Sequence, residues 1–98
     1  SQKGGLRKMK TTETFDIEKI LALSEEEINK LTFKELMQLI DMIKNYFISS
    51  ELDIEKQIEL YAKAILLLTR AREKLIAIKK QKEEIDKKYE EFLKSVEE

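Results

Sequence analysis

The sequence predicts an all-α protein: a long antiparallel helical hairpin, or a three-helix bundle like a spectrin repeat, extended by a C-terminal coiled-coil helix. The 98 residues include two glycines and no proline, with 40% charged and 42% apolar residues, a balance typical of long helices and coiled coils. Apolar residues recur at steps of three and four along much of the chain. No helix-stopping signal occurs between residues 54 and 96.

Two segments precede the main helices. Residues 1–14 carry both glycines and several cations with few apolar side chains, which predicts a disordered basic arm. Residues 15–31 are rich in isoleucine and leucine but break at Ser24, which is followed three residues later by Glu27 in the pattern of a capping box. We therefore expect two short helices here, within a single helical domain of residues 15–98.

A second capping box opens the next helix. Thr32 is followed three residues later by Glu35, and in such a box the hydroxyl and the carboxylate each accept a backbone N–H at the start of a helix. The predicted helix of residues 33–48 carries one apolar stripe, formed by Phe33, Leu36, Ile40, Ile43 and Phe47. Two serines end this pattern, and Asp53 is a favourable N-cap for a helix that returns antiparallel.

The last predicted helix, residues 54–96, is the dominant feature, with a length of about 65 Å. Its apolar stripe consists of Ile54, Ile58, Tyr61, Ile65, Leu68, Ala71, Leu75, Ile78, Lys82, Ile85, Tyr89, Phe92 and Val96. Steps of three and four alternate except from Ile65 through Leu68 to Ala71, where two threes in succession overwind a coiled coil locally. Lys82 is a polar residue inside the stripe, and such residues can set the register of a coiled coil.

This long helix exceeds anything that the chain can lay beside it. The helix of residues 33–48 is about 24 Å long and covers it only to about residue 69. Residues 15–31 either continue collinearly, which leaves the end of the long helix bare, or fold back, which leaves everything from Leu75 onward bare. In both cases we expect a partner protein to cover the stripe and, in its absence, self-association into a homo-oligomer. A solvated tail that frays is the alternative.

The composition excludes most catalytic chemistry. The chain has no histidine and no cysteine, so the usual general base, thiol nucleophile and imidazole or thiolate ligands are missing. Acidic pairs such as Asp41 with Asp53 or Glu83 with Glu84 are interpreted as solvated charge. We therefore expect no catalytic residue, no cofactor and no metal. No apolar run approaches the ~20 residues of a membrane span, and we expect a cytoplasmic protein.

The charge balance argues against direct binding of nucleic acid. The chain has 19 Lys and Arg against 20 Asp and Glu, a formal net charge of -1, so it lacks a general basic field. The long helix does contain a basic segment, formed by Arg70, Arg72, Lys74, Lys79, Lys80 and Lys82. Because no aromatic residues interleave it for base stacking, a charged outer face is the favoured interpretation, and single-stranded DNA is expected only as an indirect partner.

Residues 33–75 contain four stretches in a fixed order, Phe33-Lys-Glu-Leu36, Ser49-Ser-Glu-Leu-Asp-Ile-Glu55, Leu60-Tyr61 and Arg72-Glu-Lys-Leu75. Without a gap, these stretches resemble the exodeoxyribonuclease VII small-subunit family. That family has a helix that begins with Phe, a short Ser-Gly-x-Leu-x-Leu-Glu connection, and a second helix with an aromatic residue and a terminal Arg-x-x-Leu element. The chain departs from the pattern at Ser50 and Ala64, where the family favours Gly, and at Ala71, where it often has Cys.

The resemblance implies that a large subunit provides the nuclease site and the DNA-binding domain. This chain would be the non-catalytic small subunit, which packs on the extended helical region of the large subunit in several copies and supports degradation of single-stranded DNA. The implied partner-binding residues, divided between hairpin core and inter-chain contact in a way that the sequence leaves open, are Phe33, Leu36, Ile40, Phe47, Leu52, Ile58, Tyr61, Ile65, Leu68, Arg72 and Leu75. A generic coiled-coil scaffold or regulatory adaptor, and a helical nucleic-acid binder, are the competing hypotheses.

Overall fold

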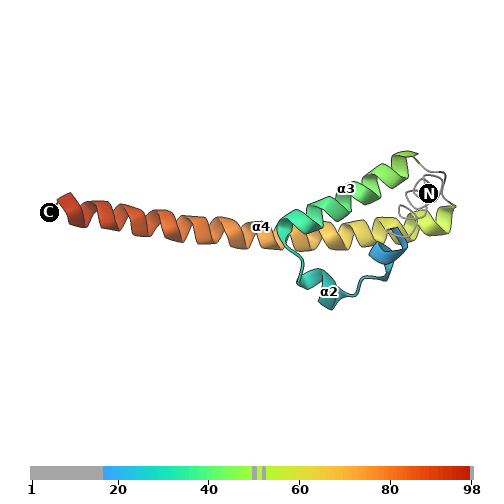
Figure 1. The fold of residues 1–98 in the computed structure, drawn as a ribbon, viewed down its shortest axis with the longest axis horizontal. Helices are drawn as coiled ribbons and strands as arrows, with labels where there is room; N and C mark the ends of the chain where they lie inside the picture. Colours follow the sequence, from blue (N-terminus) through green and yellow to red (C-terminus); the bar gives the residue numbers. More distant parts are fainter. Residues whose placement is uncertain (1–16, 50, 52, 98) are drawn as a thin grey trace, which may run out of the picture.

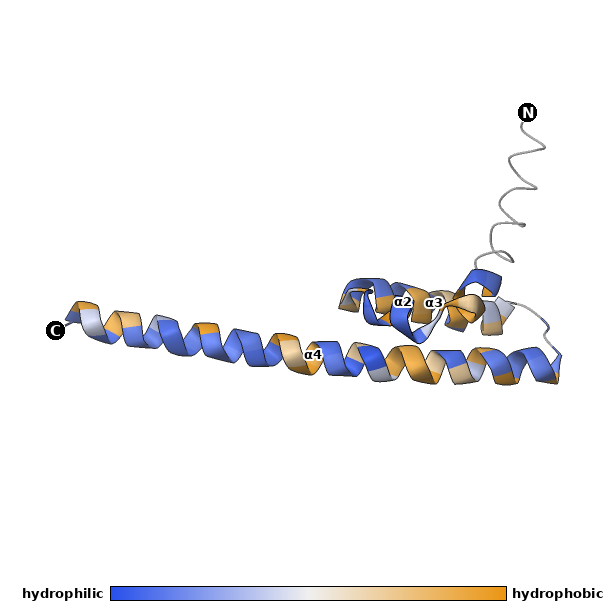
Figure 2. Ribbon diagram, turned by 90° about the horizontal axis from the view of Figure 1, so that it is seen from below, coloured by the Kyte–Doolittle hydropathy of each residue, from blue (hydrophilic) through white to orange (hydrophobic). Residues whose placement is uncertain are grey.

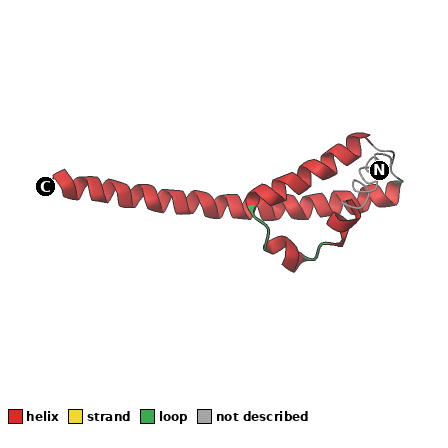
Figure 3. Cartoon of the chain, in the orientation of Figure 1, coloured by secondary structure: helices red, strands yellow, loops and turns green. Residues whose placement is uncertain are grey.

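The computed structural model describes residues 17–49, 51 and 53–97, and all the regular structure among them is helical (Figures 1 and 3). A short helical segment over residues 17–22 precedes α2 (Glu25–Asn29), α3 (Phe33–Ser49) and α4 (Ile54–Glu97). The molecule is 69 Å long in its longest direction, which is about the length of α4. The all-α prediction is confirmed, whereas the predicted basic arm of residues 1–14 lies outside the described residues.

The helices begin where the local cap residues predict. The Ser24 hydroxyl accepts the backbone N–H of Glu27 at 3.1 Å, and the Glu27 carboxylate accepts the backbone N–H of Ser24 at 3.0 Å. Thr32 and Glu35 repeat this reciprocal pair at 3.1 and 2.9 Å before α3. Asp53 Oδ1 accepts the backbone N–H of Lys56 at 2.8 Å and so caps α4. Each start is therefore fixed by side chains within one turn of it.

The apolar core lies between α3, the first half of α4 and residues 17–28. Leu36 and Ile43 of α3 and Leu60, Leu67 and Ala71 of α4 are buried. The first segments add Ile17, Ile20 and Ile28. We call the line formed by Leu60, Leu67 and Ala71 the covered face of α4.

The covered face corrects the sequence interpretation of the first half of α4. The predicted stripe ran through Tyr61 and Leu68, but the chain buries the neighbouring residues, Leu60 and Leu67, at 0% exposure. The two lines lie roughly a third of a turn apart on a helix of about 3.6 residues per turn. Both lines are apolar, and the prediction followed the one that extends farthest along the helix. α3 packs on the other.

Residues 17–31 fold back along the first half of α4, which decides between the two arrangements left open by the sequence. Four cationic side chains of α4 donate hydrogen bonds to this segment, and donors and acceptors follow the same order along the chain. The bonds are Lys56 to Glu18 Oε1 at 3.1 Å, Lys63 to the Leu23 carbonyl at 2.7 Å, Arg70 to Asn29 Oδ1 at 2.9 Å and Lys74 to the Asn29 carbonyl at 3.0 Å. The segment therefore runs parallel to α4. It occupies one side of the hairpin that α3 and α4 form.

Beyond this bundle, α4 continues alone (Figures 1 and 2). We call residues 76–97 the tail, and every residue in it is exposed. No described residue from another segment covers its apolar side chains, so the expectation of a bare stripe from about Leu75 onward is confirmed for this part of the chain.

Candidate partner-binding surface

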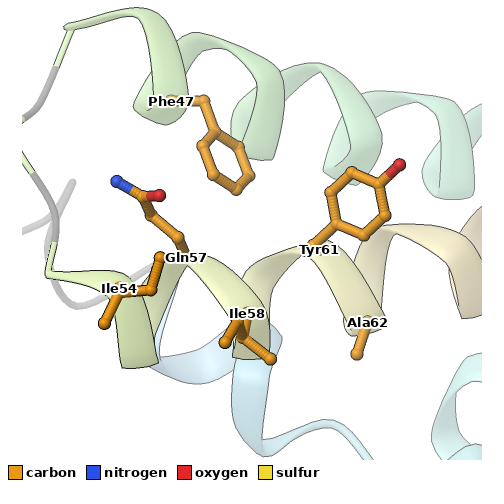
Figure 4. A pocket seen from close by; sticks show the side chains of 6 residues that line it. All are labelled: Phe47, Ile54, Gln57, Ile58, Tyr61 and Ala62. Carbon is orange, nitrogen blue, oxygen red and sulfur yellow. The ribbon is translucent and has the colours of Figure 1, made fainter.

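The second side of the α3–α4 hairpin is an open apolar groove. It is lined by Phe47 of α3 and by Ile54, Gln57, Ile58, Tyr61 and Ala62 of α4. In Figure 4 the Phe47 ring extends from α3 toward α4, into the space between Gln57 and Tyr61. Phe33 and Ile40 precede Phe47 at intervals of seven residues, so they lie along the same line of α3. This groove borders an apolar line on α4.

That line keeps large side chains in solvent. Ile58 is 63% exposed, Tyr61 67%, Ile65 50% and Leu68 45%, although each lies one or two residues from a buried position. We call Ile54, Ile58, Tyr61, Ile65 and Leu68, together with the bordering Phe33, Ile40 and Phe47, the open face. A contiguous apolar surface of this kind on a small protein is characteristic of a contact with another helix.

The structure divides the predicted partner-binding residues into three groups. Leu36 is fully buried in the chain's own core, so its assignment to partner binding is corrected. Residues that are half-buried at the edges of the open face are Phe33, Ile40, Phe47 and Leu75. Residues that are exposed to solvent are Ile58, Tyr61, Ile65, Leu68 and Arg72. Leu52 lies outside the described residues.

The tail adds a second exposed apolar line. Ile85, Tyr89 and Phe92 are 66%, 62% and 53% exposed. Lys82, the polar residue of the predicted stripe, donates to Asp86 Oδ2 at 2.8 Å one turn later. This hydrogen bond and the negative charge of Asp86 raise the pKa of the Lys82 ammonium. The charge of Lys82 is thus directed along the tail toward Asp86.

The basic segment of α4 is partly engaged within the chain. Arg70 and Lys74 bond to Asn29 and so hold the end of α2 in place, and Arg70 also pairs with Glu73 at 3.3 Å. Lys82 is paired with Asp86. These contacts favour the interpretation of a charged face with structural contacts over that of a phosphate-binding track.

The acidic residues serve the helix starts. The pKa of Glu27 is lowered mainly by its hydrogen bond from the backbone N–H of Ser24 and further by the Ser24 hydroxyl. Thr32 lowers the pKa of Glu35 in the same way. Asp53, considered as part of an acidic pair with Asp41, caps α4 instead. Over residues 17–49, 51 and 53–97, no group of three or more acidic side chains is placed to hold a metal ion. Within the same ranges, no helix combines the length and apolarity needed to cross a membrane.

The sequence interpretation missed two kinds of residue. Leu60 and Leu67 form the covered face, and Lys63 anchors the folded-back segment through the Leu23 carbonyl. A signal for the second was present, because Lys56, Lys63 and Arg70 repeat at intervals of seven beside Leu60 and Leu67. Cations at that spacing line one edge of an apolar helix face and indicate a neighbour with free carbonyl or carboxylate oxygens.

Comparison with known proteins adds no relative to this description. No protein-family model matches the chain, no curated protein matches it, and no solved structure does.

Proposed function

We propose that this chain is a non-catalytic helical subunit that binds a helix of a partner protein along the open face. The observation that carries the proposal is the gathering of Phe47, Ile58 and Tyr61 around one groove that the described residues leave uncovered. An amphipathic helix laid into such a groove removes apolar surface at about 25 cal/mol per Å². The lack of histidine and cysteine supports a non-catalytic role.

The partner in this proposal is the large catalytic subunit of an exodeoxyribonuclease VII-like complex. The support is the ungapped resemblance of residues 33–75, together with the way these residues fold, since they comprise α3 and the bundle half of α4 as one hairpin. The Arg72-Glu-Lys-Leu75 element stands at the end of that hairpin. In this role the chain supports degradation of single-stranded DNA in the cytoplasm and reaches DNA only through the large subunit.

The test is co-purification with an exodeoxyribonuclease VII large chain. We expect a stable complex and no nuclease activity from the small chain alone. The substitutions Tyr61→Ala and Leu68→Glu each remove apolar contact from the open face, and we expect them to weaken binding at least about tenfold, which corresponds to about 1.4 kcal/mol. Lys87→Glu is the matched control, because Lys87 lies on the tail away from its apolar line.

Two results would contradict this function. Robust cleavage of single-stranded DNA by the pure chain would show that it is itself catalytic. Binding to the large chain that is indifferent to Tyr61→Ala and Leu68→Glu would remove the open face from the interaction.

A generic scaffold or regulatory adaptor is the second candidate, and the tail favours it. Residues beyond Lys79 lie outside the resemblance, yet they carry Ile85, Tyr89, Phe92 and Val96 on an exposed helix. If the chain binds another helical protein through this line and ignores the nuclease chain, the adaptor is favoured. DNA affinity that falls steeply with salt would instead indicate a nucleic-acid binder.

A further inference from the structure

Most exposed apolar positions of α4, with Ile76 and Leu93 outside the set, lie on one line that is symmetric about Leu75 and also contains the polar residues Arg72 and Lys82. Counting from Leu75 toward the N-terminus, steps of three and four in alternation reach Arg72, Leu68, Ile65, Tyr61, Ile58 and Ile54. Counting toward the C-terminus, the same steps in the same order reach Ile78, Lys82, Ile85, Tyr89, Phe92 and Val96. This line contains Arg72 where the stripe predicted from the sequence contained Ala71. The two successive steps of three therefore run from Arg72 through Leu75 to Ile78. The spacing of the residues along this line is therefore the same in both directions from Leu75.

We propose that two copies of this chain pair through α4 in antiparallel orientation, with the two-fold axis at Leu75, so that the tail of each copy lies on the open face of the other. In this register Tyr61 of one copy meets Tyr89 of the other, and Ile58 meets Phe92. In heptad terms, every such pair joins an a position to a d position. Antiparallel coiled coils require that pairing, because the a and d residues of facing helices alternate along the seam.

The lengths of the two surfaces match. Ile54 meets Val96, so the two helices overlap from end to end and neither leaves a bare stretch. The double step of three lies at the same level in both chains, so both overwind together and the layers stay in register. Each bundle lies beside the other copy's tail, at opposite ends of the pair, so the bundles do not collide.

The surface removed from water is large enough for a stable pair. Ten large apolar side chains of this line are between 45% and 69% exposed, and they are Ile54, Ile58, Tyr61, Ile65, Leu68, Ile78, Ile85, Tyr89, Phe92 and Val96. With roughly 150–200 Å² per side chain of this size, covering the exposed half removes on the order of 800 Å² per chain. Specific, stable interfaces bury about that much on each partner.

The charges beside the seam do not oppose this register. The flanking pairs on one side are Glu55 with Leu93, Ala62 with Asp86 and Thr69 with Lys79, and on the other Gln57 with Ser95, Ala64 with Lys88 and Ala71 with Gln81. None of these pairs brings like charges together. By contrast, an antiparallel pairing of two tails alone sets Asp86 against Asp86 and Lys88 against Lys88, and it leaves the open face bare.

Two cations lie in the seam near its centre. Arg72 meets Ile78 and Lys82 meets Leu68 of the other copy. Both have long apolar stems and exposed head groups, so the stems can pack while the charges stay in water. The ion pair of Lys82 with Asp86 already directs its ammonium along its own helix. Polar residues at these layers weaken the pair but disfavour other registers.

This pairing does not depend on a nuclease partner, and it uses the same open face that we assign to the partner. The two interactions therefore compete, and their failures are separable. A chain that pairs with itself but ignores the nuclease chain would leave the inference intact and remove the proposed function, whereas a monomer that binds the nuclease chain would do the reverse.

The first experiment is sedimentation equilibrium of the full chain alone. We expect a monomer–dimer equilibrium with a dimer at micromolar concentration. A chain that stays monomeric at millimolar concentration would overturn the inference.

Cysteine cross-linking determines the orientation. The chain has no native cysteine, so Ile58→Cys and Phe92→Cys can be made as two single variants. Under mild oxidation we expect little disulfide in either variant alone and an abundant mixed disulfide when the two are combined. The two positions are about 50 Å apart along one helix, so the bond cannot form within a chain. Self-cross-linking of each variant would indicate a parallel pair and overturn the proposed arrangement.

A charge-exchange experiment tests the register. Tyr61→Glu and Tyr89→Lys should each weaken the dimer at least about tenfold, and the double variant should weaken it by less than the product of the two single losses, because the opposite charges then meet across the two-fold axis. Lys87→Glu, on the outer side of the tail, should change the dissociation constant less than about twofold. All three positions are exposed in the single chain, so folding is unaffected. Single losses that simply multiply in the double variant would exclude this register.

Discussion

Both sides of the α3–α4 hairpin are lined by apolar residues, but only one of them is filled by another segment among the described residues. On the filled side, Lys63 and Lys74 donate to carbonyl oxygens of residues 17–31, and the apolar contacts are sealed by a segment of the same chain. On the open side, Tyr61 and Ile65 stay 67% and 50% exposed in the described part of the chain. Apolar stripes alone do not select a neighbour, and cations at fixed intervals beside one stripe direct the folded-back segment to it.

The largest effect should separate the covered face from the tail. Leu67→Ala removes a fully buried side chain, and we expect a loss of about 3 kcal/mol in the free energy of unfolding, because the cavity cannot collapse fully. The same kind of truncation in the tail, Ile85→Ala, removes an exposed side chain and should cost less than about 0.5 kcal/mol. Urea denaturation followed by circular dichroism, at concentrations where the chain is monomeric, measures both. Equal losses of unfolding free energy in the two variants would show that the covered face and the tail do not differ in this way.

The next effect concerns the anchor of the filled side. Lys63→Met keeps an apolar stem but leaves the Leu23 carbonyl without its donor at 2.7 Å, and we expect a loss of about 1 kcal/mol. Hydrogen exchange should show faster exchange of the amides in α2 and the segment before it, with α4 little changed. Lys87→Met, which removes an exposed cation from the tail, is the control. Unchanged exchange in α2 would show that apolar packing alone holds that segment.

The smallest effect is a pH dependence of the two helix starts. The pKa values of Glu27 and Glu35 are lowered in the folded chain from an ordinary value of 4.5, so the carboxylates stabilise the caps above that pH. This contribution is lost as the pH falls through the lowered folded values. Thermal unfolding between neutral pH and about pH 3 should show a smaller loss for Glu35→Gln than for the unmodified chain, because the amide keeps the cap without titrating. An equal loss of stability at low pH in Glu35→Gln and in the unmodified chain would show that Glu35 does not contribute to the pH dependence.

The helix starts could be predicted from the sequence because their causes are local. Ser24 with Glu27, and Thr32 with Glu35, lie within one turn of each other, so their spacing determines the cap. The choice between Leu60 and Tyr61 as the buried residue could not be predicted in the same way. It depends on which side of α4 receives α3 and residues 17–31, and those contacts join positions about forty residues apart, as Lys63 and Leu23 do (|i−j|=40).

The partner-binding residues were only partly predictable for the same reason. Leu36 and Ile40 occupy one stripe of α3 four residues apart, yet Leu36 is buried and Ile40 lies at the edge of the open face. A helical stripe is wider than one contact, so periodicity identifies the apolar side but not how two neighbours divide it. The symmetry of α4 about Leu75 was also present in the sequence. It became visible only when the covered face showed that Ala71 belongs to the core and Arg72 to the exposed line.

The projection of α4 gives the protein mechanical leverage. The tail extends about 33 Å beyond the bundle as a single rod without proline or glycine. A tilt of about 10° where α4 leaves the bundle therefore displaces the C-terminal end of the helix by about 6 Å. A change in the packing of Leu67 or Ala71 that rotates the helix by this angle would produce that movement. A second helix laid along the rod would brace it at both ends and convert a pivoting arm into a rigid strut.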